Sequence, residues 1–136
     1  MAARCGITPV CSFIIGHWYD NETTIEQTIR FAVELQNDFL AQCLFSISTP
    51  LPGTALYNHA KDYDCNILFY DYEKYDMMTP VMDTKYLKAK DIRNYYFKAV
   101  TTISRKAPKE LATLLTLRKS LPKYFSSTYN YDDYLI

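Results

Sequence analysis

The fold of this chain is decided by a stretch that begins Phe-Ile-Ile-Gly-His-Trp-Tyr-Asp-Asn-Glu-Thr-Thr at residues 13–24 and ends Thr-Pro-Leu-Pro-Gly-Thr at residues 49–54. Residues 8–16 are rich in β-branched and aromatic side chains and do not alternate with polar ones, a pattern typical of a strand buried on both faces of a parallel sheet. Residues 40–48 are mostly apolar and predict a second strand. Each predicted strand runs into a loop whose residue types suit the binding of a ligand.

A well-capped helix is expected between the two strands. Thr23 is the predicted N-cap, and Glu26 would reach back to complete a capping box with it. Apolar residues at 25, 29, 32 and 33 form one helical stripe, so the helix should occupy residues 24–36, with a turn at residues 36–38. A strand, a helix and a strand joined by short connections predict a right-handed crossover and parallel pairing.

The remainder of the chain predicts helices around an irregular segment. Thr54 should cap a short helix that ends near Lys61. Residues 63–84 show no regular pattern and should lie across an apolar surface. A helix with one broad apolar face is expected from 86 to about 105, and Pro108 is well placed to begin another that ends near Leu121. We expect one domain, with a βαβα portion in residues 1–62 and the remaining residues 63–136 packed with it as one unit.

Composition indicates a globular protein. The 136 residues are 49% hydrophobic and 22% charged, which are values of folded domains. No apolar run reaches the roughly 20 residues of a membrane span, and the first residues do not form a basic-then-apolar leader, so a cytoplasmic location is expected. The four cysteines, at positions 5, 11, 43 and 65, form no CxxC pair and no zinc spacing. Cys11 and Cys43 lie in apolar runs and should be reduced and buried.

Charge is divided unevenly along the sequence. Residues 1–84 contain four basic and eleven acidic side chains, whereas residues 85–123 contain eleven basic and two acidic ones. A basic helical segment can bind nucleic acid. The segment carries no aromatic–arginine stacking motif and no glycine-rich RNA-binding signature, which favours a solvated helix face beside an acidic neighbour.

Four segments of the sequence resemble segments of a known family. They read Gly-His-Trp-Tyr-Asp-Asn-Glu-Thr-Thr at residues 16–24, a helix ending Glu-Leu at 34–35, and Phe-Ser-Ile-Ser-Thr-Pro-Leu-Pro-Gly-Thr at 45–54, followed by Tyr-Asp and Thr-Pro-Val between 75 and 81. In order and spacing they resemble the C-terminal part of radical S-adenosylmethionine enzymes. The group with a cobalamin-binding domain, and in particular the anaerobic oxidative cyclases of bacteriochlorophyll synthesis, is the most similar.

The resemblance implies an α/β fold: the last two strands of a six-stranded partial (β/α) barrel, followed by a C-terminal helical segment. In such barrels the sites lie at the carboxyl ends of the strands. The resemblance implies that the residues on the S-adenosylmethionine and substrate side are Ile15, Gly16, His17, Pro52, Gly53 and Thr54. Glycine at position 16 would permit close approach to the adenine. The alternatives are that the loop histidine is structural or solvated, and that the Pro-Gly-Thr turn only begins a helix.

The chain departs from this family in ways that decide what it can do alone. The family holds a 4Fe-4S cluster with CxxxCxxC, and this spacing is absent from the sequence. Trp18 stands where the family has proline, and Leu51 where it has tyrosine. The resemblance therefore implies a fragment that is not catalytic by itself, that binds no cofactor alone, and whose parent uses S-adenosylmethionine, an iron–sulfur cluster and in some members cobalamin.

Two other hypotheses stay open from the sequence. The chain can be a stand-alone binding module that completes a half-barrel with another chain, because exposed sheet edges need a partner. Its basic helices can make it a nucleic-acid-binding protein, whose affinity would fall steeply with salt. Its partner is accordingly expected to be the remainder of the parent enzyme or a complementary chain, with no membrane span.

Overall fold

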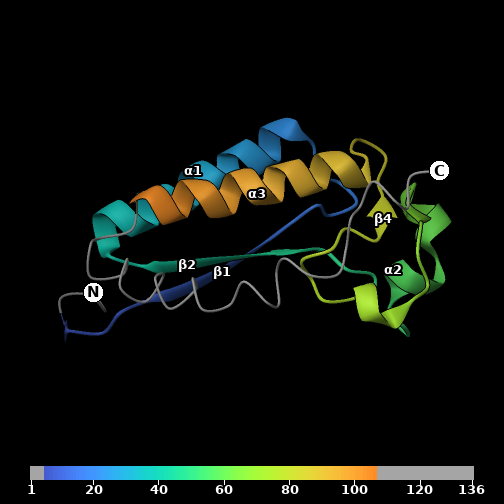
Figure 1. Cartoon of the computed structure of the whole chain (residues 1–136), viewed down its shortest axis with the longest axis horizontal. Coiled ribbons are helices and arrows are strands. Elements are labelled where there is room, and N and C mark those ends of the chain that lie inside the picture. Colours follow the sequence, from blue (N-terminus) through green and yellow to red (C-terminus); the bar gives the residue numbers. More distant parts are fainter. Residues whose placement is uncertain (1–4, 107–136) are drawn as a thin grey trace. The chain divides into compact units, whose positions relative to one another are not determined.

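A pair of parallel strands, β1 (Val10–Ile15) and β2 (Gln42–Ile47), lies at the centre of the part of the chain that the computed structural model describes, residues 5–106 (Figure 1). The register places Cys11 opposite Cys43 and Phe13 opposite Phe45. The long connection between them is helical, as a parallel pair requires. The predicted strand–helix–strand unit and its parallel pairing are confirmed.

The connecting helix α1 (Glu22–Phe39) begins two residues before the predicted start and is capped by a different residue. The side chain of Asn21 accepts a hydrogen bond from the backbone amide of Thr24, and the Thr24 hydroxyl accepts one from the amide of Asn21, at 3.1 and 3.0 Å. The predicted box of Thr23 and Glu26 is therefore wrong. The short side chains at 21 and 24 close the box two residues earlier.

α1 also continues beyond its predicted end. Residues 36–38 were expected to turn, but they are helical, and the helix ends at Leu40 in the left-handed conformation, with φ 52°. The reason is the burial of Gln36, which is 3% exposed and continues the inward-facing stripe. The amide of Ala41 then donates to the carbonyl of Leu35 at 3.2 Å and starts the return to β2.

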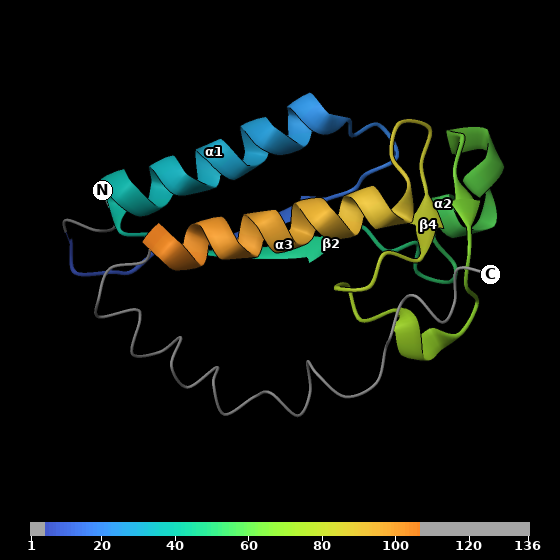
Figure 2. The ribbon, with the colours of Figure 1, turned by 45° about the horizontal axis from the view of Figure 1, so that its top comes forward.

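The core lies between one face of the sheet and two helices, α1 and α3 (Ala89–Lys106), which run side by side across that face (Figures 1 and 2). Side chains from alternate strand positions point into it. The largest members of the cluster are Ile15, Ile25, Ile29, Phe45, Ile47, Leu87, Ile92, Tyr96 and Ile103. The apolar stripe predicted for the helix over 86–105 is thus confirmed, with the helix beginning at Ala89.

The opposite face of the sheet is open within residues 5–106. Val10, Ile14 and Leu44 are 61%, 51% and 50% exposed. The prediction that the first strand is buried on both faces is therefore wrong for the described part of the chain. The strand lacks alternation in its sequence because apolar residues occupy the open face as well as the covered one.

Short elements fill the segment between β2 and α3. They are α2 (Ala55–Asn58), the 3-10 turns η2 (Ala60–Tyr63) and η3 (Tyr72–Lys74), and the antiparallel pair β3 (Asn66–Ile67) and β4 (Met82–Asp83). Thr54 caps α2 as predicted, although α2 ends at Asn58 and not near Lys61. The sequence does not predict β3 and β4, because two residues are too few to show a period. No helix within residues 5–106 has the length and apolar character that crossing a bilayer demands.

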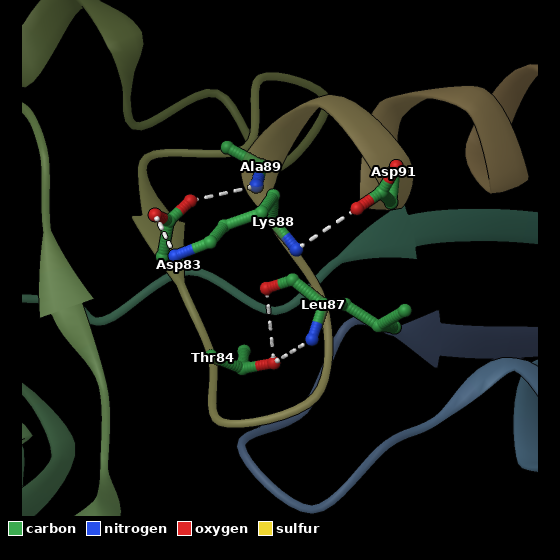
Figure 3. Close-up of polar contacts among 6 residues, drawn as sticks. All are labelled: Asp83, Thr84, Leu87, Lys88, Ala89 and Asp91. Carbon is green, nitrogen blue, oxygen red and sulfur yellow. Dashed lines mark hydrogen bonds and ion pairs between the residues drawn. The ribbon is translucent and has the colours of Figure 1, made fainter.

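The start of α3 is fixed by side chains of the preceding strand and turn (Figure 3). The carboxylate of Asp83 in β4 accepts the amide of Ala89 at 2.8 Å and pairs with the Lys88 ammonium at 3.1 Å. The Thr84 hydroxyl accepts the amide of Leu87 at 3.1 Å and donates to its carbonyl at 3.3 Å. α3 is thereby anchored over the sheet. The predicted helix from Pro108 to about Leu121 lies outside the described residues.

Candidate functional site at the carboxyl edge of the sheet

The structure brings the two predicted binding loops to the same edge of the sheet. Because β1 and β2 are parallel, residues 16–20 and residues 48–54 both leave from carboxyl ends, the position at which parallel sheets bind ligands. The amide of Ser48 donates to the carbonyl of Ile15 at 2.8 Å and ties the two exits together. The predicted site residues from positions 15–17 and 52–54 therefore share one edge.

Gly16 has two structural reasons to be glycine. Its φ of 77° lies in the left-handed region, and a Cβ atom there would lie 2.8 Å from Cγ2 of Ile92 in α3. The neighbouring Ile15 is 1% exposed and belongs to the core. These two residues fix the direction of the chain as it leaves β1. The expectation that they touch a ligand stays a prediction, since packing alone explains both residue types.

The first loop is ordered by the carboxylate of Asp20, which sequence reasoning did not single out. Asp20 is 7% exposed; one oxygen accepts the amide of His17 and the other accepts the hydroxyl of Thr24, both at 2.9 Å. The amide of Asp20 in turn donates to the carbonyl of His17 at 2.9 Å. An acidic residue just before a helix cap was the available signal in the sequence. Its role is to hold the His17 backbone in a tight turn.

The side chains of this loop form an aromatic surface. The His17 ring stacks on the Tyr19 ring, with centroids 5.2 Å apart and planes 6° apart. Trp18 meets Tyr19 edge-on and lies 5.3 Å from the ring of Tyr63 in η2. Trp18 and Tyr19 remain 41% and 51% exposed. A tryptophan at position 18 thus connects the first loop to the segment that follows the second one, while leaving ring surface open to a ligand.

The second loop is exposed, and the hydroxyl of Thr54 forms hydrogen bonds within the loop and with the helix that follows it. The hydroxyl of Thr54 accepts the amide of Tyr57 at 3.3 Å and donates to the carbonyl of Leu51 at 2.7 Å. Gly53 has φ 85°, and nothing lies within 4 Å of the Cβ that a side chain would place there. The backbone conformation alone therefore explains glycine at position 53, whereas the backbone conformation and the close contact with Ile92 both explain glycine at position 16. Pro52 is exposed beside it.

A third segment reaches the same edge from farther along the chain. One carboxylate oxygen of Asp76 accepts the amides of Met78 and Thr79 at 2.8 and 2.7 Å. This turn holds Met77 at φ 59°, and the Met77 carbonyl accepts the amide of Ile47 at 2.6 Å. The segment between residues 75 and 81, which belongs to the blocks named for their resemblance in the sequence analysis, is therefore attached to the carboxyl end of β2.

Four tyrosines gather beyond the second loop, and the sequence did not predict this cluster. Tyr57 and Tyr70 have ring centroids 6.2 Å apart, and Tyr72 and Tyr75 have centroids 5.8 Å apart. Burial raises the pKa of Tyr57, and a hydrogen bond with Tyr72 raises it further. Burial and then the neighbouring tyrosines raise the pKa of Tyr75, whose hydroxyl donates to the carbonyl of Phe69 at 2.9 Å. The raised pKa values favour the protonated phenols of Tyr57 and Tyr75, which can act as hydrogen-bonding groups.

The cysteines differ in burial: Cys43 is buried as predicted and Cys65 is buried too, whereas Cys11 is only half-buried and Cys5 is exposed. Cys43 is 4% exposed, its thiol donates to the carbonyl of Ala32 at 3.3 Å, and burial followed by the neighbouring Cys11 raises its pKa to about 11. Burial also raises the pKa of Cys65. Thiolate is the form that binds metal, so both environments disfavour ligation. Among residues 5–106, no three His, Cys, Asp or Glu side chains stand close enough together to hold a metal ion.

The fold and the residues at the carboxyl edge of the sheet define a parallel α/β unit, with aromatic and backbone groups at the carboxyl ends of its strands. No family model matches the chain. It is 36% identical over 98 residues to an uncharacterized methyltransferase of Pyrococcus horikoshii. It is also 42% identical over 77 residues to the anaerobic magnesium-protoporphyrin IX monomethyl ester cyclase of Cereibacter sphaeroides.

These similarities cover much of this chain but little of its relatives. The aligned residues are 72% of this chain and 20% of the methyltransferase, and 55% of this chain and 11% of the cyclase. The chain thus spans about a fifth of one relative and about a ninth of the other. The similarity is therefore to one portion of each protein.

Proposed function

We propose that this chain is the C-terminal portion of a radical S-adenosylmethionine enzyme, in which β1 and β2 are the last two strands of a partial barrel. The observation that carries the proposal is the meeting of both family-like loops at the carboxyl edge of one parallel pair, with the opposite sheet face open. The partial similarity to a methyltransferase and to an anaerobic cyclase supports it. The parent would perform radical-based methyl transfer or ring formation.

The site residues contribute binding and orientation in this proposal. Trp18 and Tyr19 offer exposed ring faces on which a flat group such as adenine, or an aromatic substrate, can stack. The half-buried His17 ring is held parallel to Tyr19 and presents its nitrogens beside that surface. Ile15 and Gly16 set the position of the loop through packing, and Pro52, Gly53 and Thr54 form the facing turn. No step of bond cleavage is assigned to any of these residues.

The iron–sulfur cluster does not fit this chain. CxxxCxxC is absent from the sequence, and the two cysteines with raised pKa values are buried in structural positions. In the proposed parent, the cluster, and cobalamin if the parent uses it, would be held by residues outside these 136. The chain alone is accordingly proposed to be inactive.

The test is to read the coding sequence around this chain and to express the whole open frame. We expect an upstream CxxxCxxC in the same frame, and cleavage of S-adenosylmethionine to 5′-deoxyadenosine by the complete protein after anaerobic reconstitution with iron and sulfide. The 136-residue chain treated in the same way is the control and should bind no stoichiometric iron. A frame without the motif, or a cluster in the short chain, would contradict the proposal.

The stand-alone module is the second candidate, and the open sheet face is the observation that favours it. It differs from the first only in whether the missing strands come from the same polypeptide.

The ion pairs of the basic segment bear on the nucleic-acid hypothesis. Lys85 pairs with Asp64 at 3.5 Å, Lys88 pairs with Asp83, and Lys98 pairs with Glu26. Lysines of the basic segment thus face carboxylates of the same chain, which supports the interpretation as a solvated helix face.

A further inference from the structure

We propose that the tyrosine cluster beyond the second loop, formed by Tyr57, Tyr70, Tyr72 and Tyr75, binds an arginine side chain presented by a second polypeptide. The inference goes beyond the proposed function and does not depend on it, because none of the four tyrosines lies in the two loops at the carboxyl edge of the sheet. The occupant is identified by its chemistry: a planar cation that carries several N–H donors.

The four tyrosines form one aromatic surface, although they come from separate segments. Tyr57 lies in α2 and meets the ring of Tyr70 at 84°, with centroids 6.2 Å apart. Tyr72 begins η3 and meets the ring of Tyr75 at 71°, with centroids 5.8 Å apart. The side chains of Tyr57 and Tyr72 form a hydrogen bond with each other, which joins the two pairs. The cluster is therefore one surface and not two isolated contacts.

Two of the rings are open to a partner. Tyr70 and Tyr72 are each 65% exposed, whereas Tyr57 and Tyr75 are half-buried. Sites for small molecules are concave and bury most of the ligand. An open aromatic surface instead suits a side chain that projects from another polypeptide, and tyrosine and arginine are both enriched in the energetically important centres of such interfaces.

The charge of this segment selects a cation. Residues 57–76 contain five acidic and two basic side chains. Asp71 and Glu73 flank Tyr72, both are exposed, and neither takes part in an ion pair within the described part of the chain. One of the two basic side chains, Lys74, is buried, with its ammonium 4.2 Å from the centre of an aromatic ring. Charge complementarity therefore favours a positively charged partner.

The chemistry of the surface favours a guanidinium group over other cations. Among residues 5–106, no three His, Cys, Asp or Glu side chains stand close enough together to hold a metal ion. A guanidinium is planar, stacks on aromatic faces and carries five N–H donors, whereas a lysine ammonium is a strongly hydrated point charge without a flat face. Phenol oxygens and the carboxylates of Asp71 and Glu73 are acceptors for those donors. Arginine is therefore the side chain that uses both the rings and the carboxylates.

A titration of the 136-residue chain followed by nuclear magnetic resonance tests the inference. The probe is a capped peptide in which two arginines alternate with glycines, and the control probe is the same peptide with two lysines. The arginine peptide should shift the ring resonances of Tyr70 and Tyr72, and the lysine peptide should bind at least about threefold more weakly. Equal affinities, or no shift at these rings, would overturn the proposal.

Two further probes test other occupants. Tetramethylammonium, which has no N–H donors, and N-acetylarginine amide, a small guanidinium compound, should each bind at least about threefold more weakly than the arginine peptide. Tetramethylammonium binding as tightly as the peptide would overturn the assignment of a guanidinium. N-acetylarginine amide binding as tightly would overturn the assignment of a polypeptide.

Matched variants locate the site. Tyr70→Leu and Tyr72→Leu should each lower the affinity for the arginine peptide about 2–5-fold. Tyr86→Leu removes a tyrosine ring of similar exposure, 55%, outside the cluster, and is the control. Glu73→Gln should weaken binding at low salt and have less effect at high salt, because the charge is exposed. A loss at position 86 equal to those at 70 and 72 would contradict the site.

These measurements stay interpretable if one variant fails to fold or if the proposed function fails. Tyr70→Leu leaves the hydrogen bond between Tyr57 and Tyr72 in place, so it tests the cluster even where Tyr72→Leu unfolds. None of the titrations involves S-adenosylmethionine or a reaction. A complete protein that does not cleave S-adenosylmethionine would overturn the proposed function alone, and a chain that does not bind the arginine peptide would overturn this inference alone.

Discussion

Gly16 faces Ile92 so closely that a Cβ atom on residue 16 would lie 2.8 Å from the Cγ2 atom of that isoleucine. The glycine follows the last residue of β1 and the isoleucine lies in the first turn of α3, so this approach limits how near the helix comes to the candidate site. Two independent constraints, a positive φ and a steric one, act on a single position.

Gly16→Ala should destabilise the protein by about 2–4 kcal/mol, the sum of a left-handed backbone penalty and an overpacked contact. Gly53→Ala is the matched control, because φ is 85° there but nothing lies within 4 Å of the added atom, and it should cost about 1 kcal/mol. Urea unfolding measures both. Shortening Ile92 to valine in the Gly16→Ala background should recover part of the loss, and equal costs at the two glycines would contradict the steric account.

Asn21→Ala should cost about 1 kcal/mol because it removes the side chain that caps α1. Thr23→Ala is the control. Position 23 lies inside the helix, so that substitution should leave the free energy of unfolding within about 0.5 kcal/mol of the wild-type value. A larger loss of stability for Thr23→Ala than for Asn21→Ala would contradict this account and would support Thr23 as the N-cap.

The thiol of Cys43 should make stability depend on pH in the alkaline range. Its pKa is about 11 in the folded protein and 9.0 in the ordinary thiol, so the folded state holds this proton more tightly. The contribution is fully present below pH 9 and is lost as the pH rises toward 11, up to about 2 kcal/mol.

Tyr57 and Tyr75 shift in the same direction, so the contribution of Cys43 has to be isolated. The free energy of unfolding should be followed from pH 8 to 11 in the wild type and in Cys43→Ala. The variant should be less stable at pH 8 and should lose less stability over this range. Parallel pH profiles would show that the thiol is not the buried group described above.

Trp18→Ala should weaken binding of S-adenosylmethionine or substrate to the complete protein by roughly 2–10-fold, the value of one aromatic contact. Trp18→Phe should retain most of the affinity. Phe97→Ala removes an exposed ring from α3, 54% exposed against 41% for Trp18, and serves as the control. Isothermal titration measures all three variants, and a loss at position 97 equal to that at 18 would indicate a general effect on stability.

The sequence predicted the large elements because their periods are long enough to read. The stripe of Ile25, Ile29 and Ala32 and the apolar runs around Phe13 and Phe45 each repeat over several residues. It failed at helix ends and at two-residue strands, where one hydrogen bond decides the outcome. Asn21 and Thr23 are both good caps, and the choice between them depends on tertiary geometry that a pattern does not contain.

The candidate site was predictable in its position but not in its construction. Loops after parallel strands meet by topology, which is why Gly16 and Gly53 come to one edge. The contact between Trp18 and Tyr63, and the attachment of Met77 to Ile47, join residues from different parts of the chain. No local spacing in the sequence signals such contacts.

The hydrogen bond between Ile47 and Met77 has a consequence for assembly. A sheet with two equivalent free edges can add copies without end and form fibres. Here the Met77 carbonyl already holds the amide of Ile47, one of the backbone groups of β2 that point away from β1. A second copy that paired along the carboxyl end of β2 would have to displace this carbonyl, so the hydrogen bond disfavours growth of the sheet at that end.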